Sequence, residues 1–450
     1  MMGPKTVGLG AMVIWLMGGG FVATASAAET PSPVTIPEIL TLDRATEIAL
    51  SNHPSLRVAS GTQSANLARV GQAQSAYFPQ VQARGAYQQA TANNSTSFGG
   101  GPTQRRTSGE NFGTYLSNVN LNQTIFDFGK IRSQVDTAQF NFQAARSDSE
   151  TTLQTVVVNV QQAYYGLQQA QRLVQVNEEA LVQFQKHLDL AKGRFKVGVA
   201  PKIDVTTAEV DLSNARLNLI TAKNNRLVAR ATLNNAMGII STGPYNVEYP
   251  GPFESYAVTM EEALDRAMRL RPEMVSQRAL EQAADAAITT AQSDFFPTVS
   301  GAAAYSYNGQ EFPLVWNWNL TGSVAIPIFS GFLTKQQVAE ARANLLRTKA
   351  NGDVLRQTIQ LEVSQALLNL QAAEERLRVT AITVTQAKER LALVEGRYKA
   401  GLSNAVEVTD GEVALVNAQV NDVVAMSSYQ SSKAQLERAM GTISTAQGRP

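Results

Sequence analysis

The chain has 450 residues, 17% of them charged, and a formal net charge of +1 at pH 7. Because the sequence has neither a basic patch nor a Lys/Arg tract, we expect no nucleic-acid partner. The absence of cysteine excludes disulfides, thiolate metal sites and a lipid-modified cysteine. Past the N-terminus, no stretch is apolar over the about 18 to 20 residues that a membrane-spanning helix needs.

The N-terminus carries the longest apolar run of the chain. Lys5 is followed by the segment TVGLGAMVIWLMGGGFVATASAAET, which ends in small residues. A basic residue, an apolar core and small residues at the end are typical of a secretory signal peptide, with an uncleaved anchor as the alternative. We therefore expect residues 1–28 to be a signal peptide, and the exported chain to begin at Ala28 or Glu29.

The exported part contains one unit twice. The segment Thr41–Leu56 is similar to Thr259–Met274, an offset of 259 − 41 = 218 residues. From Phe126 onward the second copy follows at an offset of 329 − 126 = 203 residues, so the first copy has 218 − 203 = 15 extra residues. Similarity at a fixed offset indicates a duplicated structural unit.

This duplication divides the chain into parts. We expect a first repeat over 29–240, a linker over 241–258, a second repeat over 259–441 and a C-terminal tail over 442–450. Each repeat reads as a helix, two strands and two further helices. The extra residues fall in TSFGGGPTQRRTSGEN, between the two strands of the first repeat, so we expect a surface loop there.

The strands of each repeat follow the sequences YFP and FFP, where proline ends a helix. We expect β-hairpins over about 80–125 and about 298–328, the second extending past Ile326 to Ile328. Apolar and aromatic side chains alternate there with Asn, Thr, Ser and Gln. Either the sheet packs on a protein core, or it is the lipid-facing wall of a barrel with a wet interior. In the second case the aromatics at the membrane interface are Tyr87, Tyr115, Tyr305, Trp316 and Trp318.

Four strands cannot close a barrel across a membrane, since every strand edge in lipid must be paired. Three copies would supply 12 strands, an even number within the range of known barrels. The sequence therefore predicts a homotrimer in contact with outer-membrane lipid.

Long helical hairpins are predicted over about 130–238 and about 333–441. Apolar residues recur there at alternating steps of three and four for about six heptads, which is the seam of a coiled coil. The first long helix, from about Lys130 to Val197, would measure about 100 Å at about 1.5 Å per residue. That length is too great for a globular core.

The same sequence occurs at the turn of both hairpins. Arg194–Ala215 reads RFKVGVAPKIDVTTAEVDLSNA and Arg397–Ala418 reads RYKAGLSNAVEVTDGEVALVNA, with ten of 22 positions identical. Glycines at this point favour a left-handed turn that ends a helix, so Gly198 and Gly401 are expected to end the long helices.

An acidic residue follows each turn. Asp204 and Glu407 fall in the first turn of the next helix, where the helix dipole favours an acid whatever its function. Asp410 lies three residues after Glu407 and so on the same helix face. If three chains gather their tips around one opening, Glu407 and Asp410 would form a ring of six carboxylates.

No group of residues indicates an enzyme or a cofactor site. Of the two histidines, His53 precedes Pro54 at a helix junction and His187 lies on the long helix, so both are expected to be structural or exposed. They lack the spacing of metal ligands, and GGGPTQRRT lacks the Lys-Ser/Thr of a phosphate-binding loop. We therefore expect no catalytic residue, no metal and no cofactor.

The signal peptide, the duplication, LSNHPSL, YFP, IFDFG and RFKVGVAPKIDV with its second copy resemble the TolC-like outer-membrane efflux proteins. The resemblance covers nearly all of the exported chain. It implies an α+β membrane protein, in which a trimeric 12-stranded outer-membrane β-barrel continues into a periplasmic α-helical barrel. TSFGGGPTQRRTSGEN joins two strands at the end away from the helices, so we expect it to be an extracellular loop.

The resemblance further implies the channel of a tripartite efflux or type I secretion system. Its partners would be a periplasmic adaptor and an inner-membrane pump, either proton-driven or of the ABC class. The residues that match the family's pattern at the tips, where the adaptor docks, are Phe195, Gly198, Tyr398 and Gly401. The acidic positions tied to gating and selectivity are Asp204, Glu407 and Asp410. Ser403 departs from the pattern, since some relatives have a basic residue at this turn.

A trimeric coiled-coil surface adhesin is the alternative, because it also closes a 12-stranded barrel from three chains. Its strands would form one block at the C-terminus, whereas two separated hairpins are expected here. Drug efflux, protein secretion and metal export stay open as cargo classes, because the pump selects most of the cargo.

Overall fold

The computed structural model describes residues 37–91, 111–240, 243–249, 253 and 255–443, all of which belong to one compact unit. The predicted signal peptide and nearly all of TSFGGGPTQRRTSGEN lie outside the described residues. The first repeat contains α1 (Leu42–Asn52), α2 (Pro54–Gln74), a 3-10 turn (Ser75–Tyr77), β2 (Gln80–Thr91), β3 (Asn111–Phe126), α3 (Lys130–Lys196) and α4 (Lys202–Ala236). The second repeat contains α5 (Met260–Leu270), α6 (Pro272–Ser293), β5 (Thr298–Gly309), β6 (Val315–Ala325), α7 (Leu333–Lys399) and α8 (Ala405–Ala439).

The duplication is present in the helix lengths. Helices α3 and α7 have 67 residues each, and α4 and α8 have 35 each. Both pairs start 203 positions apart, since 333 − 130 and 405 − 202 give the same offset. The similar sequences at the two turns thus end the first helix of each hairpin, and begin the second, at equivalent positions.

Each repeat begins with two helices where the sequence analysis predicts one. His53 and Arg271 precede a proline and have an extended backbone, with ψ of 125° at both. Proline clashes with a helical residue before it, so one helix ends there and the next begins at the proline. His53 Nδ1 also accepts a hydrogen bond from Ser55 N at 3.2 Å, which makes this histidine a helix cap.

A small two-stranded sheet joins the start of the first repeat to the linker that follows it. In the predicted linker, β4 (Asn246–Val247) pairs in parallel with β1 (Ile39–Leu40). This contact could not be predicted from the sequence, because two residues are too few to show an alternating pattern.

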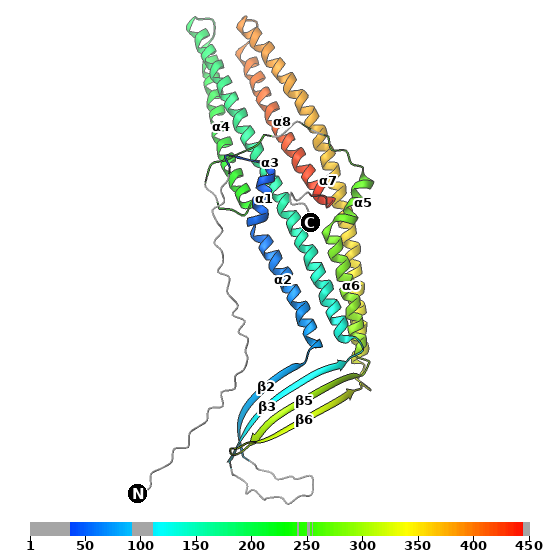
Figure 1. The fold of residues 1–450 in the computed structure, drawn as a ribbon. Helices are drawn as coiled ribbons and strands as arrows, with labels where there is room; N and C mark the ends of the chain where they lie inside the picture. Colours follow the sequence, from blue (N-terminus) through cyan, green and yellow to red (C-terminus); the bar gives the residue numbers. More distant parts are fainter. Residues whose placement is uncertain (1–36, 92–110, 241–242, 250–252, 254, 444–450) are drawn as a thin grey trace, which may run out of the picture. The chain divides into compact units, whose positions relative to one another are not determined.

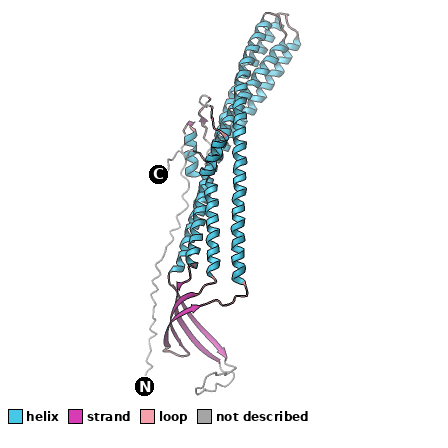
Figure 2. Ribbon diagram, turned by 90° about the vertical axis from the view of Figure 1, so that its right-hand side faces the viewer, coloured by secondary structure: helices cyan, strands magenta, loops and turns pink. Residues whose placement is uncertain are grey.

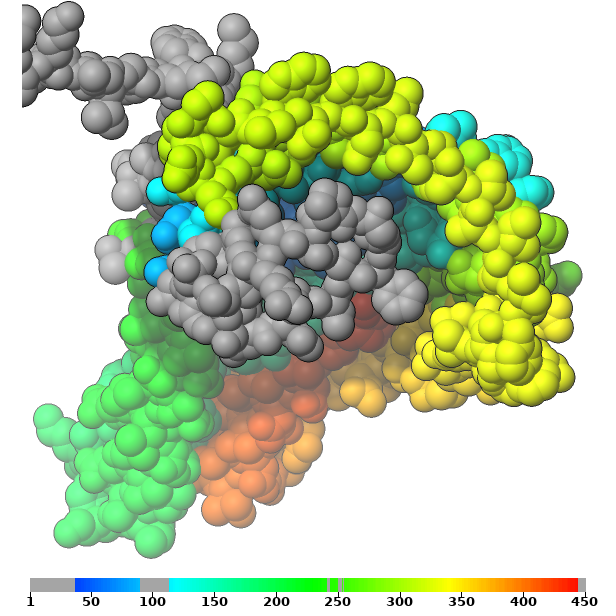
Figure 3. Space-filling model, turned by 90° about the horizontal axis from the view of Figure 1, so that it is seen from below, coloured from blue at the N-terminus to red at the C-terminus, as the bar shows by residue number. Residues whose placement is uncertain are grey.

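The four long strands form one antiparallel sheet in the order β2-β3-β5-β6. It lies at the end opposite the tips of the helical hairpins, as Figures 1 and 2 show. Seen from the strand end, β5 and β6 form a curved wall, and the surface is hollowed beside it (Figure 3). The predicted end of the second hairpin is wrong: β6 ends at Ala325, so Ile326 and Ile328 lie beyond it, because Pro327 has no N–H to pair.

The predicted alternation continues across the whole sheet. One row of paired residues joins Val81, Leu121, Ala303 and Leu320. The neighbouring row, on the opposite face, joins Gln82, Asn120, Ala304 and Asn319. One face is therefore apolar and the other mostly polar.

The helices form a layer that is four helices wide at two levels. Near the sheet the order is α2, α3, α6, α7, and toward the tips it is α4, α3, α8, α7 (Figure 1). Seam residues form the core: Val160, Leu167, Ile359 and Leu370 are at most 1% exposed. In the described part of the chain, no helix combines the length and the apolar character needed to cross a membrane.

Two glycines with similar backbones differ in their surroundings. φ is +69° at Gly238 and +78° at Gly198. A Cβ at Gly238 would lie 2.7 Å from His53 Cα, whereas nothing lies within 4 Å of one at Gly198. We expect Gly198→Ala to destabilise the fold by about 1–2 kcal/mol through left-handed strain alone. Gly238→Ala should destabilise it more, because the His53 backbone must also move.

Thermal unfolding of the two purified variants measures this difference. A larger decrease in Tm is expected for Gly238→Ala than for Gly198→Ala. Equal decreases in Tm would show that the contact between a Cβ at position 238 and the His53 backbone does not destabilise the fold, contrary to this prediction.

Candidate functional site at the hairpin tips

Both helical hairpins turn through the same hydrogen-bonded motif. In the first, Gly198 N donates to Phe195 O at 3.0 Å, and Val199 N donates to Arg194 O at 3.0 Å. This pair of bonds is the Schellman motif, which requires a left-handed residue at the turn. Gly401, with φ of +75°, repeats the geometry in the second hairpin.

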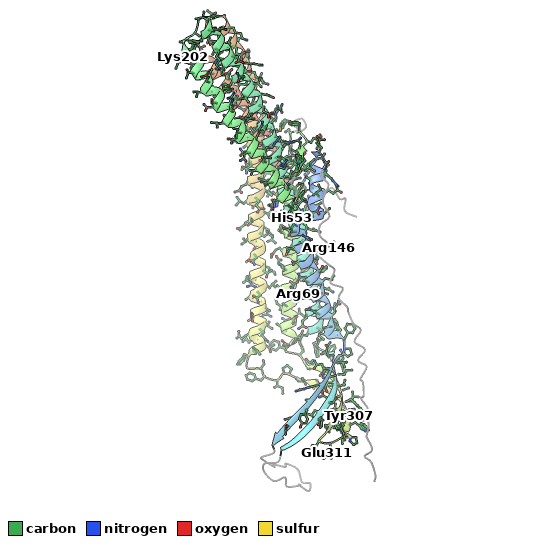
Figure 4. The ribbon with its side chains drawn as sticks, turned by 90° about the vertical axis from the view of Figure 1, so that its left-hand side faces the viewer. His53, Arg69, Arg146, Lys202, Tyr307 and Glu311 are labelled. Carbon is green, nitrogen blue, oxygen red and sulfur yellow. The ribbon has the colours of Figure 1, made fainter. Side chains whose placement is uncertain are left out.

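The turns lie at the end of the molecule farthest from the sheet. Figure 4 labels Lys202, the first residue of α4, at this end. Tyr307, in β5, and Glu311, in the connection from β5 to β6, are labelled at the opposite end, and His53 lies between the two ends.

The tips expose apolar side chains, but not at equivalent positions. Phe195 is 46% exposed, whereas Tyr398, 203 positions later, is 2% exposed. Both are predicted docking residues, yet only Phe195 exposes its side chain. The other apolar side chains exposed around the two turns, which the sequence analysis does not single out, are Val197, Val199, Ile203, Leu402 and Val406. Exposed apolar clusters of this kind are typical of interaction surfaces.

Tyr398 connects the second hairpin to the first. Its ring stacks on His187 with centroids 5.9 Å apart, and the Arg194 guanidinium carbon lies 4.5 Å from the Tyr398 ring centroid. Arg194 Nη1 donates to Tyr398 O at 2.6 Å. The Tyr398 hydroxyl is buried without a hydrogen-bond partner, and burial raises the pKa of this phenol. Tyr398 is thus placed to hold the two hairpins together.

The two predicted ring acids lie in successive turns of α8. Glu407 Oε2 accepts a hydrogen bond from Ser403 Oγ at 2.7 Å and lies 3.7 Å from Arg397 Nη1. Asn404 Oδ1 accepts from Glu407 N at 2.9 Å, so the helix is capped without the Glu407 carboxylate. Asp410 is exposed one turn farther along. Side-chain groups that could hold a metal ion are absent from the described ranges.

Asp204, the third predicted acid, occupies the equivalent place in the first hairpin. It lies half-buried in the first turn of α4, after Pro201. No side chain caps this helix, so the Asp204 carboxylate is the acidic group that faces the amide end of the helix dipole.

A buried pair of titratable side chains was not predicted. The side chains of His187 and Glu412 are 3% and 2% exposed, with Nδ1 and Oε1 3.9 Å apart. Glu209 is the equivalent of Glu412, since 412 − 203 = 209, yet it forms an exposed ion pair with Lys192 at 3.3 Å. The local sequences AEVDL and GEVAL are too similar to distinguish the two positions.

The predicted interface aromatics lie together on the apolar face of the sheet. Tyr87 pairs with Tyr115, and their ring centroids are 4.9 Å apart. Tyr305 pairs with Trp318 and stacks on Trp316 with a centroid distance of 6.3 Å. A second aromatic group, which the sequence analysis does not single out, lies where strands meet helices and consists of Phe126, Phe128 and Phe296.

The layer of helices ends on both sides in an uncovered apolar stripe. On α4 the stripe contains Ile203, Val210 and Leu217, which are 66%, 54% and 62% exposed. On α7 it contains Val354, Leu361 and Leu368, which are 61%, 58% and 59% exposed. Both stripes repeat every seven residues, which is the spacing of a coiled-coil seam. Exposed apolar stripes with this spacing are typical of surfaces on which another helix packs.

Comparison with known proteins identifies the family. A family model described as outer membrane efflux protein matches residues 45–239 and 263–442, which correspond to the two repeats. The chain is 25% identical over 412 residues to the probable efflux pump outer membrane protein TtgC of Pseudomonas putida KT2440, covering 89% of this chain and 82% of TtgC. It is 24% identical over 418 residues to the outer membrane protein TolC of Escherichia coli K12, covering 88% of this chain and 80% of TolC.

The fold also matches a solved structure. The CmeC outer membrane channel of Campylobacter jejuni has a TM-score of 0.78 and 19% identity, covering 90% of this chain and 87% of CmeC. At that level of identity the similarity shows a shared fold. Because the two segments matched by the family model span most of its length, the chain belongs to the outer membrane efflux protein family.

Proposed function

We propose that three copies of this chain form a channel through the outer membrane, continued across the periplasm by a tunnel of helices. As an outer membrane efflux protein, the chain is located in the Gram-negative outer membrane and extends into the periplasm. The sheet is then the membrane part and the helical hairpins the periplasmic part. A periplasmic adaptor would connect the hairpin tips to an inner-membrane pump, which selects the cargo.

The unpaired edges of the sheet and of the helix layer are the observation that supports this proposal best. The strand order leaves β2 and β6 at opposite edges, and the helix order toward the tips leaves α4 and α7 at opposite edges. A second copy beside the first would bring β6 to β2 and α7 to α4. Rotation about one axis repeats these contacts until the ring closes, so no strand edge stays unpaired in lipid. Three copies give 12 strands, an even number that keeps all neighbours antiparallel.

The dimensions of the sheet support a position in the membrane. Strands β2 and β5 have 12 residues and β6 has 11. Tilted strands need about 9–11 residues to cross the hydrocarbon layer. The aromatic groups at the two ends of the sheet would form the two interfacial girdles of such a barrel. The polar face, with Asn120 and Asn319, would then line the channel.

The tips would serve as docking surface and gate. Two hairpins per chain and three chains present six similar turns, so the adaptor would meet a pseudo-sixfold surface with Phe195, Gly198 and Gly401 at its contacts. We assign buried Tyr398 to the contact between hairpins instead of to the adaptor. Glu407 and Asp410 would form the acidic ring at the aperture, and Asp204 would lie beside it on the first hairpin.

Two other functions receive less support. A coiled-coil adhesin would have its strands in one C-terminal block, whereas here four helices and the short strand β4 separate β2 and β3 from β5 and β6. An enzymatic role has no support from the comparisons, which relate the chain to outer membrane efflux proteins such as TtgC. We therefore propose a channel with no catalytic residue.

Cross-linking of the detergent-extracted protein tests the trimer. Leu217 on α4 and Ile382 on α7 are exposed and lie equally far from their turns, since 217 − 198 and 401 − 382 are both 19 residues. Because the chain has no cysteine, Leu217→Cys combined with Ile382→Cys provides the only thiols for a short bismaleimide. We expect covalent products that stop at three chains.

The matched control moves one thiol along the same helix. Leu217→Cys with Val354→Cys places the two thiols at different heights, since Val354 is 401 − 354 = 47 residues from its turn. Little cross-linking is expected for this pair. Products that stop at two chains, or that continue beyond three, would contradict the trimer.

A further inference from the structure

The two helical hairpins meet around a buried pair of titratable side chains. His187 on α3 and Glu412 on α8 are at most 3% exposed at the side chain, and His187 Nδ1 lies 3.9 Å from Glu412 Oε1. Apolar layers enclose the pair, one containing Leu188 and Leu212 and the other Tyr398 and Val408. Movement of one hairpin away from the other would bring water to both groups.

Neighbouring polar groups leave the pair poorly satisfied. Glu412 Oε2 is buried and accepts no hydrogen bond in the described structure. Helix α4 supplies Asp211, whose Oδ2 accepts from Thr409 Oγ1 at 3.2 Å, and α7 supplies Glu395, whose Oε1 accepts from Gln183 Nε2 at 2.5 Å. The other charged or titratable groups around the pair are Arg194 on α3, Asp204 on α4, Tyr398 on α7, and Lys399 on α7, whose Nζ lies 3.9 Å from Glu395 Oε2. The surroundings therefore contain more carboxylates than cations.

Both members of the pair are neutral while the hairpins are packed. Burial raises the pKa of Glu412 to about 8, and the Glu395 and Asp211 carboxylates add to this effect. Burial also lowers the pKa of His187, against the opposite influence of Asp211, Glu395 and Asp204. A neutral acid and a neutral imidazole can stay buried without a counter-charge.

We propose that His187 and Glu412 form a proton-dependent contact between the hairpins, which stays packed while both side chains are neutral and separates with release of the Glu412 proton. The effect of this contact on transport rests on the proposed function, because separation of the hairpins would widen the tip of the proposed tunnel. It provides a way for pH in the periplasm to bias the tip.

The direction of the effect follows from the two protonation states. In water, Glu and His titrate near about 4.3 and about 6.5. Above about pH 6.5, His187 is neutral in both states, whereas Glu412 keeps its proton only in the packed state, up to a pH of about 8. Separation releases one proton in this window, so rising pH favours separation by up to about tenfold per pH unit. Below about pH 6.5, proton uptake by separated His187 balances this release, and the dependence becomes flat.

Pulsed EPR within one chain measures the separation directly. Lys186→Cys on α3 and Asn417→Cys on α8 give two exposed labelling positions in a chain that has no other cysteine. Labelled chains are diluted with unlabelled chains, so that the measured distance lies within a single copy. Between pH 6.5 and 8 we expect the ratio of long to short distances to increase by about eightfold, because both ends of this window lie at a pKa where titration is half complete.

Three substitutions distinguish this contact from a general effect of pH. Glu412→Gln should remove the pH dependence and keep the short distance at pH 8. Glu209→Gln, at the equivalent exposed position, should leave the native response unchanged. His187→Gln should extend the dependence below about pH 6.5, because no imidazole then takes up the compensating proton.

A pH response that survives in Glu412→Gln would overturn the proposal, and so would a native distance that does not change with pH. A His187→Gln response that still flattens at about pH 6.5 would exclude the role of this histidine. The distance measurement requires neither adaptor nor transport, so its failure is distinct from failure of the channel function. The cross-linking of Leu217→Cys with Ile382→Cys reports on assembly separately.

Discussion

A valine at Gly401 is expected to stop export while the channel still assembles. Gly401 has φ of +75°, a region that β-branched residues strongly disfavour. Nothing lies within 4 Å of a Cβ at this position, so the substitution acts through the turn and not through a clash. The sheet lies at the opposite end of α7, which is 67 residues or about 100 Å long. Barrel formation should therefore be unaffected.

The expected loss concerns the docking surface. If a distorted turn weakens adaptor binding by about 1.4 kcal/mol, the affinity decreases about tenfold for each turn, and a trimer contains three copies of it. Ethidium efflux by cells that carry only the variant measures export, and cross-linking of the extracted protein measures assembly. Gly198→Val, in the first hairpin, is expected to have the same effect.

A glycine in the same hairpin provides the control. Gly396 lies five residues before Gly401, has a helical backbone, and likewise has open space at its Cβ. Gly396→Val should leave export near the native level. If Gly401→Val and Gly198→Val also export normally, the turns have no part in docking.

Glu407→Gln combined with Asp410→Asn is expected to remove the cation preference of the purified channel. Six carboxylates around one opening would raise the local concentration of cations and give multivalent cations a place to block. The double variant removes all six and leaves Arg397, now 3.7 Å from a neutral side chain, without its ion pair. The reversal potential in a planar bilayer under a salt gradient should shift toward that of anions, and block by multivalent cations should weaken.

Helix capping alone predicts a different result. Each acid near a helix start contributes about 0.3–1 kcal/mol, and the Asn404 cap is retained, so assembly should change little. The control variant, Glu178→Gln with Glu209→Gln, removes the same number of carboxylates from exposed ion pairs on the first hairpin. If the reversal potential and the cation block respond equally in both variants, or in neither, Glu407 and Asp410 do not line the aperture.

The long elements could be predicted from the sequence because their determinants are local. Helix α3 ends at Lys196, one residue before the predicted end. The prediction is close because the glycine that forms the turn is visible in the local sequence. The alternation of apolar and polar residues likewise predicts the two faces of the sheet, which the register then aligns across four strands. The error at the end of β6 also has a local cause. The alternating pattern continues to Ile328, but Pro327 has no N–H for a ladder hydrogen bond, and the strand ends at Ala325.

The environment of each equivalent position was decided only by the tertiary structure. Val158 on α3 is 3% exposed, whereas Leu361, 203 positions later on α7, is 58% exposed. The same contrast separates buried Glu412 on α8, which lies between two helices, from exposed Glu209 on α4, which lies at the other edge. Duplicated sequences specify the same helices, seams and turns, because these depend on neighbours along the chain. In the layer, however, α3 lies between two helices and α7 lies at an edge, so burial differs between the copies, and with it the pKa and the available partners of each side chain.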